Sequence, residues 1–164
     1  MASPTSHRVR AVASAALDGL VVGGAEAALD LPARSWARAR VYLAITAAVT
    51  VETVLRELPA LRRAVRGLPA LPDDPQDQAA RLHQALVTTG WGLVVTVVDG
   101  PLARTLRRDG HAHPHLLLGV VAGVAAAAST APVWWRLATA RIAQDRATAG
   151  LDDELAELLE QMSD

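Results

Sequence analysis

The sequence predicts an all-α integral membrane protein, a helical bundle with four transmembrane helices. The first observation is the stretch 115–135, which contains no arginine and no acidic residue. It is long enough to cross a bilayer, since about 20 apolar residues span the roughly 30 Å hydrocarbon core. It ends in Trp134, Trp135 and Arg136, the residue types expected where a span meets water.

The second observation is the composition. Hydrophobic residues make up 51% of the 164 residues, yet Phe is absent and aromatic residues account for only 3%. Closely packed Ala- and Gly-rich helices in lipid do not need large rings, whereas a soluble core of this size usually depends on them. A soluble helical bundle is the alternative, and it predicts recovery of the protein without detergent.

Composition also excludes several classes of protein. Without Cys the chain has no disulfide framework and no thiol nucleophile. The net charge of −1 gives no field that would attract nucleic acid, and no nucleic-acid partner is expected. No catalytic motif and no cofactor-binding motif is present, so we expect a protein that is not an enzyme and holds no cofactor. The lack of Lys and Asn is typical of a GC-rich bacterial genome.

The first of the four spans is the weakest. It contains Asp18, Glu26 and Asp30, and an ionised carboxylate at the centre of a bilayer costs about 2.5–3.5 kcal/mol. An amphipathic helix packed on the other three is the alternative. The arginines before it also resemble a signal peptide, but Asp18 interrupts the apolar run early, so we expect an uncleaved helix. The expected spans are 10–31, 41–58, 79–99 and 115–135.

Proline and glycine residues are expected to end the helices between the spans. The linker 59–78 contains four prolines, too many for one continuous helix, and its basic segment 61–68 suits the lipid headgroups. Asp99-Gly100-Pro101 is expected to end the third helix and to begin a short basic helix. A polar helix follows Trp135 and is expected to break at Gly150.

The chain therefore divides into a membrane domain, 1–136, and a cytoplasmic acidic helical tail, 137–164. Within the tail, 151–162 has leucines at helical spacing beneath an acidic face, and we expect it to order against a partner. That partner is a second copy of the chain or another protein at the membrane or in the cytoplasm.

The arginines predict the orientation of the chain. Ten of the 16 lie on the side of the termini and of the linker 59–78, and six lie in the two hairpin connections. Under the positive-inside rule both termini are cytoplasmic in a multi-pass protein of the plasma membrane.

The two halves of the chain also resemble each other. Gly-Leu-Val-Val at 19–22 precedes Glu26, and the same four residues at 92–95 precede Asp99. Either the chain consists of two duplicated helix hairpins, or chance matches in a sequence of low complexity produce the similarity.

Three carboxylates form a candidate intramembrane polar site, namely Glu26, Asp99 and Glu52. An ionisable group within a span is a functional candidate because its burial is costly. The alternatives are structural: Asp99 caps the following helix, Glu26 pairs with Arg34, and Glu52 pairs with Arg56 at the favourable i,i+4 spacing.

Two further sets of residues have recognisable spacing. His111, His113 and His115 alternate, so an extended segment could direct them at one metal ion, although solvated histidines are the alternative. Two G-x-x-x-G pairs could bring helices into close contact. They are Gly19 with Gly23 and Gly119 with Gly123.

Two functions fit these features. The first is a non-enzymatic accessory or scaffold protein that acts through helix contacts within the bilayer and through its C-terminal tail. The second is a small transporter or an ion or proton pathway that uses Glu26 and Asp99. Loss of flux on replacing these carboxylates favours the second, and loss of a partner on deleting residues 151–164 favours the first.

Overall fold

The structure, a computed structural model, describes residues 3–69 and 75–161 and confirms an all-α protein. About 90% of the chain is helical, and the described residues form no strand. The helices are α1 (Pro4–Ala27), continued by the short 3-10 turn η1 (Ala28–Asp30), α2 (Trp36–Val65), α3 (Pro75–Arg108) and α4 (Pro114–Gln161).

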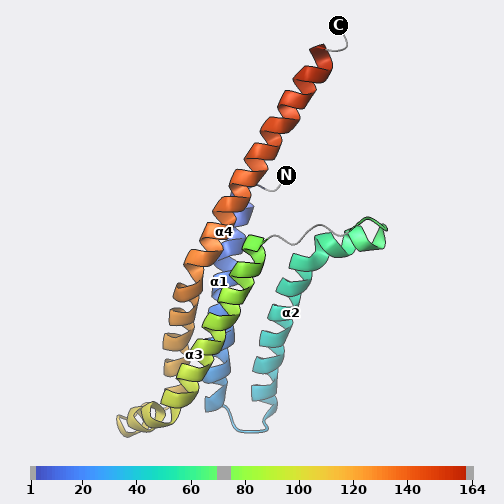
Figure 1. Cartoon of the computed structure of the whole chain (residues 1–164). Helices are drawn as coiled ribbons and strands as arrows, with labels where there is room; N and C mark the ends of the chain where they lie inside the picture. The colour runs from blue at the N-terminus through green and yellow to red at the C-terminus, as the bar shows by residue number, and fades with distance from the viewer. Residues whose placement is uncertain (1–2, 70–74, 162–164) are drawn as a thin grey trace.

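Helices α1, α3 and α4 form a bundle, and α2 lies to one side of it (Figure 1). The main contact is between α1 and α4, and α3 packs mainly on α4. Helix α2 touches α1 and has no fully buried residue. Successive helices run in opposite directions, so that both ends of the chain lie at the same end of the bundle, which we call the terminal end; the other is the hairpin end (Figure 1).

Three helices are long and apolar enough to cross a membrane. They are Pro4–Asp30, Pro75–Arg108 and Pro114–Leu151. The first span, expected to be the weakest, is among them. The expected second span, 41–58, is not among them, because Glu52, Arg56 and Glu57 interrupt the apolar stretch of α2. A membrane crossing by α2 stays a prediction.

Large apolar side chains face outward along these helices. Leu86 and Val97 of α3 and Val121 of α4 are each more than half exposed. An apolar surface of this extent on an isolated chain is typical of a surface that meets lipid or another protein.

Pro59 and Pro101 do not end their helices, and this part of the sequence prediction is wrong. Helix α2 continues through Pro59, and α3 continues through Gly100 and Pro101 to Arg108. Proline removes one backbone hydrogen bond and bends a helix, but the turns on either side can still form. Figure 1 shows the result: the last turns of both helices run sideways, and these bent ends carry the basic residues predicted for the membrane interface. Of the expected linker, 59–65 and 75–78 are helical, and 70–74 lie outside the described residues.

The predicted break at Gly150 is also wrong. Helix α4 continues through Pro132 and Gly150 to Gln161, far beyond the other helices (Figure 1). A glycine inside a helix costs about 1 kcal/mol relative to alanine, which weakens a helix without ending it. Leu151 and Leu155 are exposed on this extension. The side chains at 152–154 and 156–160 lie outside the described part, so the acidic face of the tail stays a prediction.

The four glycines singled out in the sequence lie where α1 crosses α4. A Cβ atom added to Gly19 would lie 2.5 Å from the carbonyl oxygen of Gly123, and one added to Gly123 would lie 2.8 Å from that of Gly19. Gly23 and Gly119 face each other in the same way one turn further along. The two backbones are therefore in direct contact, which only glycine permits at these positions.

Asp18 links the three helices of the bundle. It is only 2% exposed, and its carboxylate accepts hydrogen bonds from Gln84 Nε2 of α3 at 2.7 Å and from Trp134 Nε1 of α4 at 2.9 Å. Two neutral donors from neighbouring helices thus stabilise this carboxylate, whose burial was expected to weaken the first span.

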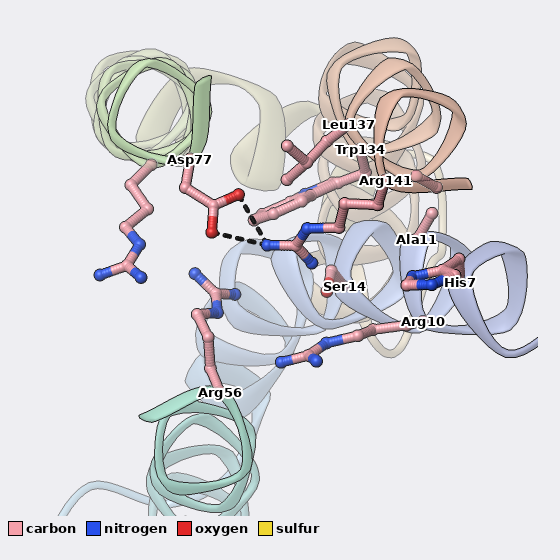
Figure 2. A pocket seen from close by; sticks show the side chains of 11 residues that line it. His7, Arg10, Ala11, Ser14, Arg56, Asp77, Trp134, Leu137 and Arg141 are labelled. Atoms are coloured by element: carbon pink, nitrogen blue, oxygen red, sulfur yellow. Dashed lines mark hydrogen bonds and ion pairs between the residues drawn. The ribbon is translucent and has the colours of Figure 1, made fainter. Parts of the chain in front are cut away.

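The terminal end of the bundle is held by charged groups. Arg141 Nη2 of α4 donates to both carboxylate oxygens of Asp77 of α3 at 2.6 Å (Figure 2). Arg56 of α2 pairs with Glu52 and lies over the ring of Trp134, 5.1 Å from its centroid. His7 Nε2 of α1 lies 3.0 Å from Asp145 Oδ2 of α4.

Candidate functional site

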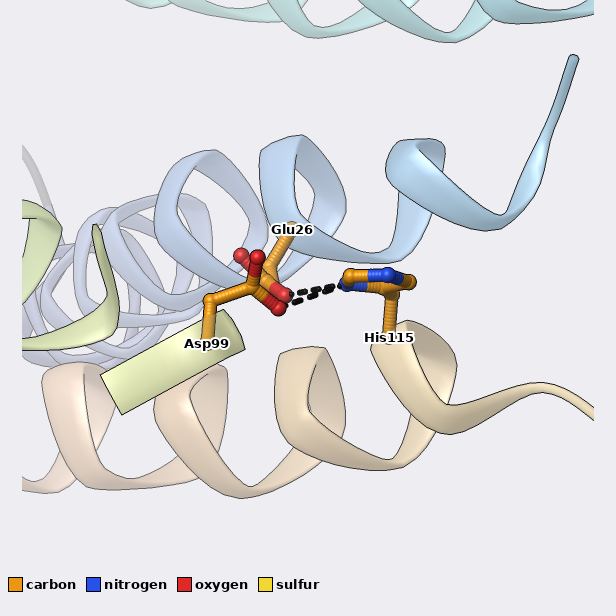
Figure 3. A group of neighbouring side chains, drawn as sticks. All are labelled: Glu26, Asp99 and His115. Carbon is orange, nitrogen blue, oxygen red and sulfur yellow. Dashed lines mark hydrogen bonds and ion pairs between the residues drawn. The ribbon is translucent and has the colours of Figure 1, made fainter. Parts of the chain in front are cut away.

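Three ionisable side chains from three helices converge near the hairpin end of the bundle. Figure 3 shows Glu26 of α1, Asp99 of α3 and His115 of α4 pointing toward one another. His115 Nδ1 lies 2.9 Å from Glu26 Oε1 and 2.7 Å from Asp99 Oδ1. Glu26 and His115 are buried and Asp99 is half-buried. We call these three residues the cation cluster.

Helical spacing explains why Glu26 meets His115. Glu26 follows Gly19 and Gly23 on the face of α1 that contacts α4, since residues three, four and seven apart share one side of a helix. His115 precedes Gly119 and Gly123 on the facing side of α4 at intervals of four. The close approach of the two backbones therefore brings the side chains of Glu26 and His115 into direct contact.

Asp30 fixes the start of α4 beside the cation cluster. Its Oδ2 accepts a hydrogen bond from the backbone N–H of Leu116 at 2.7 Å, and its Oδ1 accepts one from the N–H of His115 at 3.3 Å. The first N–H groups of a helix lack partners within the helix, and a carboxylate placed there satisfies them and suits the helix dipole. Asp30 thus has a structural role that also positions His115.

Arg107 determines which nitrogen of His115 carries the hydrogen. Arg107 Nη2 of α3 lies 3.2 Å from His115 Nε2. A guanidinium can only donate, so Nε2 must accept, and the hydrogen of a neutral ring is then on Nδ1. Nδ1 donates it to Glu26 Oε1. His115 is therefore held between a donor on one side and two carboxylates on the other.

Asp99 Oδ1 receives no hydrogen bond from the described residues although it is buried. It lies 2.7 Å from His115 Nδ1, but the hydrogen bond from that nitrogen goes to Glu26. A buried oxygen without a donor is costly, especially on a carboxylate. The cation cluster therefore has an acceptor that a positively charged ligand would satisfy.

The donor set of the cation cluster suits a divalent metal ion. A carboxylate oxygen from Glu26, one from Asp99 and the imidazole Nδ1 lie within 4.8 Å of one another. Two carboxylates repel each other at this distance, and a cation between them removes the repulsion. Carboxylate and imidazole ligands together are typical of Zn²⁺, Mn²⁺ and Fe²⁺ sites.

The structure brings together some of the predicted site residues and separates others. Of the three carboxylates, Glu26 and Asp99 meet, whereas Glu52 lies on α2, where it pairs with Arg56 and accepts a hydrogen bond from Ser14 Oγ at 3.4 Å. Asp99 lies inside α3 and does not begin a helix. Glu26 contacts His115 and not Arg34.

The three histidines do not form a common site. His111 and His113 are exposed in the connection before α4, whereas His115 is buried in the first turn of that helix. Among the described residues, the cation cluster is the only group with metal-ligand spacing. The sequence prediction grouped His115 with His111 and His113. The signal that pairs His115 with Glu26 is the matching spacing of glycines on the two helices, and it was overlooked.

The chain matches no known protein family, no curated protein and no solved structure. A functional conclusion therefore depends on the chemistry of its side chains.

Proposed function

We propose that this chain is a small, non-enzymatic membrane protein that binds a divalent metal ion within its helix bundle and serves as a cation pathway. The observation that carries the proposal is the convergence of Glu26, Asp99 and His115 from three helices. Each of the helices that supplies one of these residues is long and apolar enough to cross a membrane.

A comparison with the other acidic residues of the bundle favours a cation site over a purely structural role. Asp18 and Asp30 each accept two hydrogen bonds from neutral donors, as expected of carboxylates that hold helices together. Around Glu26 and Asp99, by contrast, the one neutral N–H donor of His115 bonds to Glu26, and Asp99 Oδ1 has no donor within the described chain. Helix packing does not require two acidic groups side by side, whereas cation binding does.

Metal binding at this site would displace a hydrogen. A ligating nitrogen needs a free lone pair, so Nδ1 of His115 must give up its hydrogen when a metal ion binds. A neutral imidazole keeps one hydrogen, so the hydrogen would move to Nε2, and Arg107 would have to turn away from that nitrogen. Arg107 is exposed, and its side chain is able to turn. Cation entry is thus coupled to a change of tautomer at His115 and to movement of Arg107.

Flux through reconstituted liposomes tests this function. Purified full-length protein in liposomes is expected to admit Zn²⁺ or Mn²⁺, measured with a trapped fluorescent indicator, and Glu26→Gln and Asp99→Asn are expected to abolish the signal. Asp109→Asn is the matched control because it removes an exposed carboxylate near the same end of the bundle. Flux equal to that of empty liposomes, or unchanged flux in Glu26→Gln, would contradict the proposal.

A second candidate function is that of an accessory or scaffold protein. It is favoured by the length of α4, which extends beyond the bundle and exposes Leu151 and Leu155 one turn apart. Such a stripe suits a second copy of the chain or another protein. Deletion of residues 151–164 is expected to abolish recovery of that partner while leaving cation flux intact; unchanged recovery would refute this function.

The proposed orientation places both termini in the cytoplasm at the plasma membrane. It is supported by the excess of arginines at the terminal end and by the antiparallel course of the helices. Reporter fusions at the C-terminus and after His111 test it. The C-terminal fusion is expected to report a cytoplasmic location and the other an external one; the opposite result would reverse the orientation.

A further inference from the structure

Each of the four helices contributes one arginine to a single small cavity at the terminal end of the bundle. Arg10 comes from α1, Arg56 from α2, Arg81 from α3 and Arg141 from α4 (Figure 2). We call these residues the arginine cluster. It lies at the opposite end of the bundle from the cation cluster and shares no residue with it.

Carboxylates neutralise three members of the arginine cluster. Arg141 pairs with Asp77 and Arg56 pairs with Glu52. Arg81 Nη1 lies 3.2 Å from Glu57 Oε1, in a pair that is about half exposed. Of these three acids only Asp77 lines the cavity.

Arg10 is the member without a counter-ion. It lines the cavity but makes no hydrogen bond or ion pair with the described part of the chain. Its charge is repelled by the neighbouring Arg56 and Arg141 and attracted by Glu52 and Asp77, which form the ion pairs of those two arginines. Four guanidinium groups gathered in this way leave an excess of positive charge, which an anion would balance.

If α1 and α3 cross a membrane, the cavity lies near the level of the lipid headgroups. Trp134 lines the cavity. The guanidinium of Arg8 lies over the ring of the next residue, Trp135, 5.8 Å from its centroid. Tryptophan and arginine gather where a span meets the polar layer of a membrane. Two of the apolar spans begin here, at Pro4 and Pro75.

We propose that the arginine cluster binds a phosphoryl group, either the headgroup phosphate of an anionic lipid or free inorganic phosphate. Guanidinium groups bind phosphate oxygens through paired, charge-assisted hydrogen bonds. Arg10 supplies a guanidinium that forms no ion pair with the described residues, and Arg81 is exposed enough to turn toward the ligand. Binding there joins all four helices, including α2, whose backbone lies close only to α1 and η1.

The test uses purified full-length protein in detergent and two probes. Native mass spectrometry measures retention of phosphatidylglycerol relative to phosphatidylcholine. Thermal unfolding measures stabilisation by inorganic phosphate relative to chloride at equal ionic strength. Arg10→Gln is expected to weaken binding by about tenfold or more, because it removes charge-assisted hydrogen bonds. Arg8→Gln is the matched control, since it removes the same charge two residues away and outside the cavity.

The outcomes separate the two sources of phosphate. Selective retention of phosphatidylglycerol that is lost in Arg10→Gln and kept in Arg8→Gln supports a lipid headgroup. Stabilisation by inorganic phosphate with the same pattern supports free phosphate. Arg81→Gln is expected to weaken binding as well, and it serves if Arg10→Gln does not fold. An equal loss in Arg8→Gln, or no preference for either probe in the wild-type protein, would overturn the proposal.

Discussion

The close crossing of α1 and α4 makes Gly19→Ala a sharp test of the fold. The added Cβ atom would lie 2.5 Å from the carbonyl oxygen of Gly123, whereas ordinary van der Waals contact begins at 3.4 Å. The obstacle is backbone, which cannot rotate away as a side chain can. The two helices must therefore move apart by about 0.9 Å at this point.

The expected cost follows from this displacement. Overpacking of this kind costs about 1–3 kcal/mol, and the better helix propensity of alanine returns about 0.5–1 kcal/mol. We expect Gly19→Ala to lower the free energy of unfolding by up to about 2.5 kcal/mol. Circular dichroism during thermal unfolding in detergent measures it.

Gly92→Ala is the matched control. Gly92 lies inside α3, and a Cβ atom there would meet nothing within 4 Å. The same substitution is therefore expected to leave stability unchanged or to raise it slightly. If Gly19→Ala and Gly92→Ala unfolded at the same temperature, the described contact between α1 and α4 would be refuted.

Three further substitutions test other contacts. Asp18→Ala leaves the N–H groups of Trp134 and Gln84 without an acceptor and is expected to cost about 1–3 kcal/mol in thermal unfolding; a stability equal to wild type would contradict the buried network. Asp30→Ala removes the carboxylate that caps the N-terminus of α4 and is expected to lower the free energy of unfolding by about 0.5–2 kcal/mol, measured in the same way. An unchanged free energy of unfolding would contradict this cap. Arg107→Leu frees Nε2 of His115 to carry the hydrogen, so Zn²⁺ affinity measured by calorimetry is expected to rise several-fold; the same rise in Arg108→Leu would mean that only the net charge matters.

The sequence was sufficient to predict the four helices and the apolar character of three of them, but not where the helices end. Asp99-Gly100-Pro101 has the composition of a helix boundary, yet α3 bends there and continues. Proline removes one backbone hydrogen bond and bends the helix, yet the turn beyond it still forms, with Ala103 buried. Local propensity alone cannot predict such burial, because it depends on helices distant in sequence.

Only part of the candidate site was predictable from the sequence, because the rest depends on contacts between helices that are distant in sequence. The free-energy cost of burying an acidic residue within a span is enough to single out Glu26 and Asp99 as candidate site residues. Their partner was not identified, because His115 is 89 residues from Glu26 and the contact depends on how α1 crosses α4. The glycine spacing before Glu26 and after His115 carries that information once the two helices are known to meet.

The duplication of two helix hairpins stays a prediction. Glu26 and Asp99 each follow the repeated Gly-Leu-Val-Val at the same interval, and they meet in the cation cluster. A symmetric pair of hairpins, however, would bring α2 against α3 as α1 lies against α4. The backbones of α2 and α3 make no such contact over the described residues.

Metal content after equilibrium dialysis tests the cation cluster most directly. Full-length protein in detergent, dialysed against Zn²⁺ and measured by elemental mass spectrometry, is expected to retain one ion per chain. Glu26→Gln and His115→Ala are expected to retain none, and Asp109→Asn is expected to behave as wild type. Absence of stoichiometric metal in the wild-type protein, or equal metal content in Glu26→Gln, would contradict a cation site built from Glu26, Asp99 and His115.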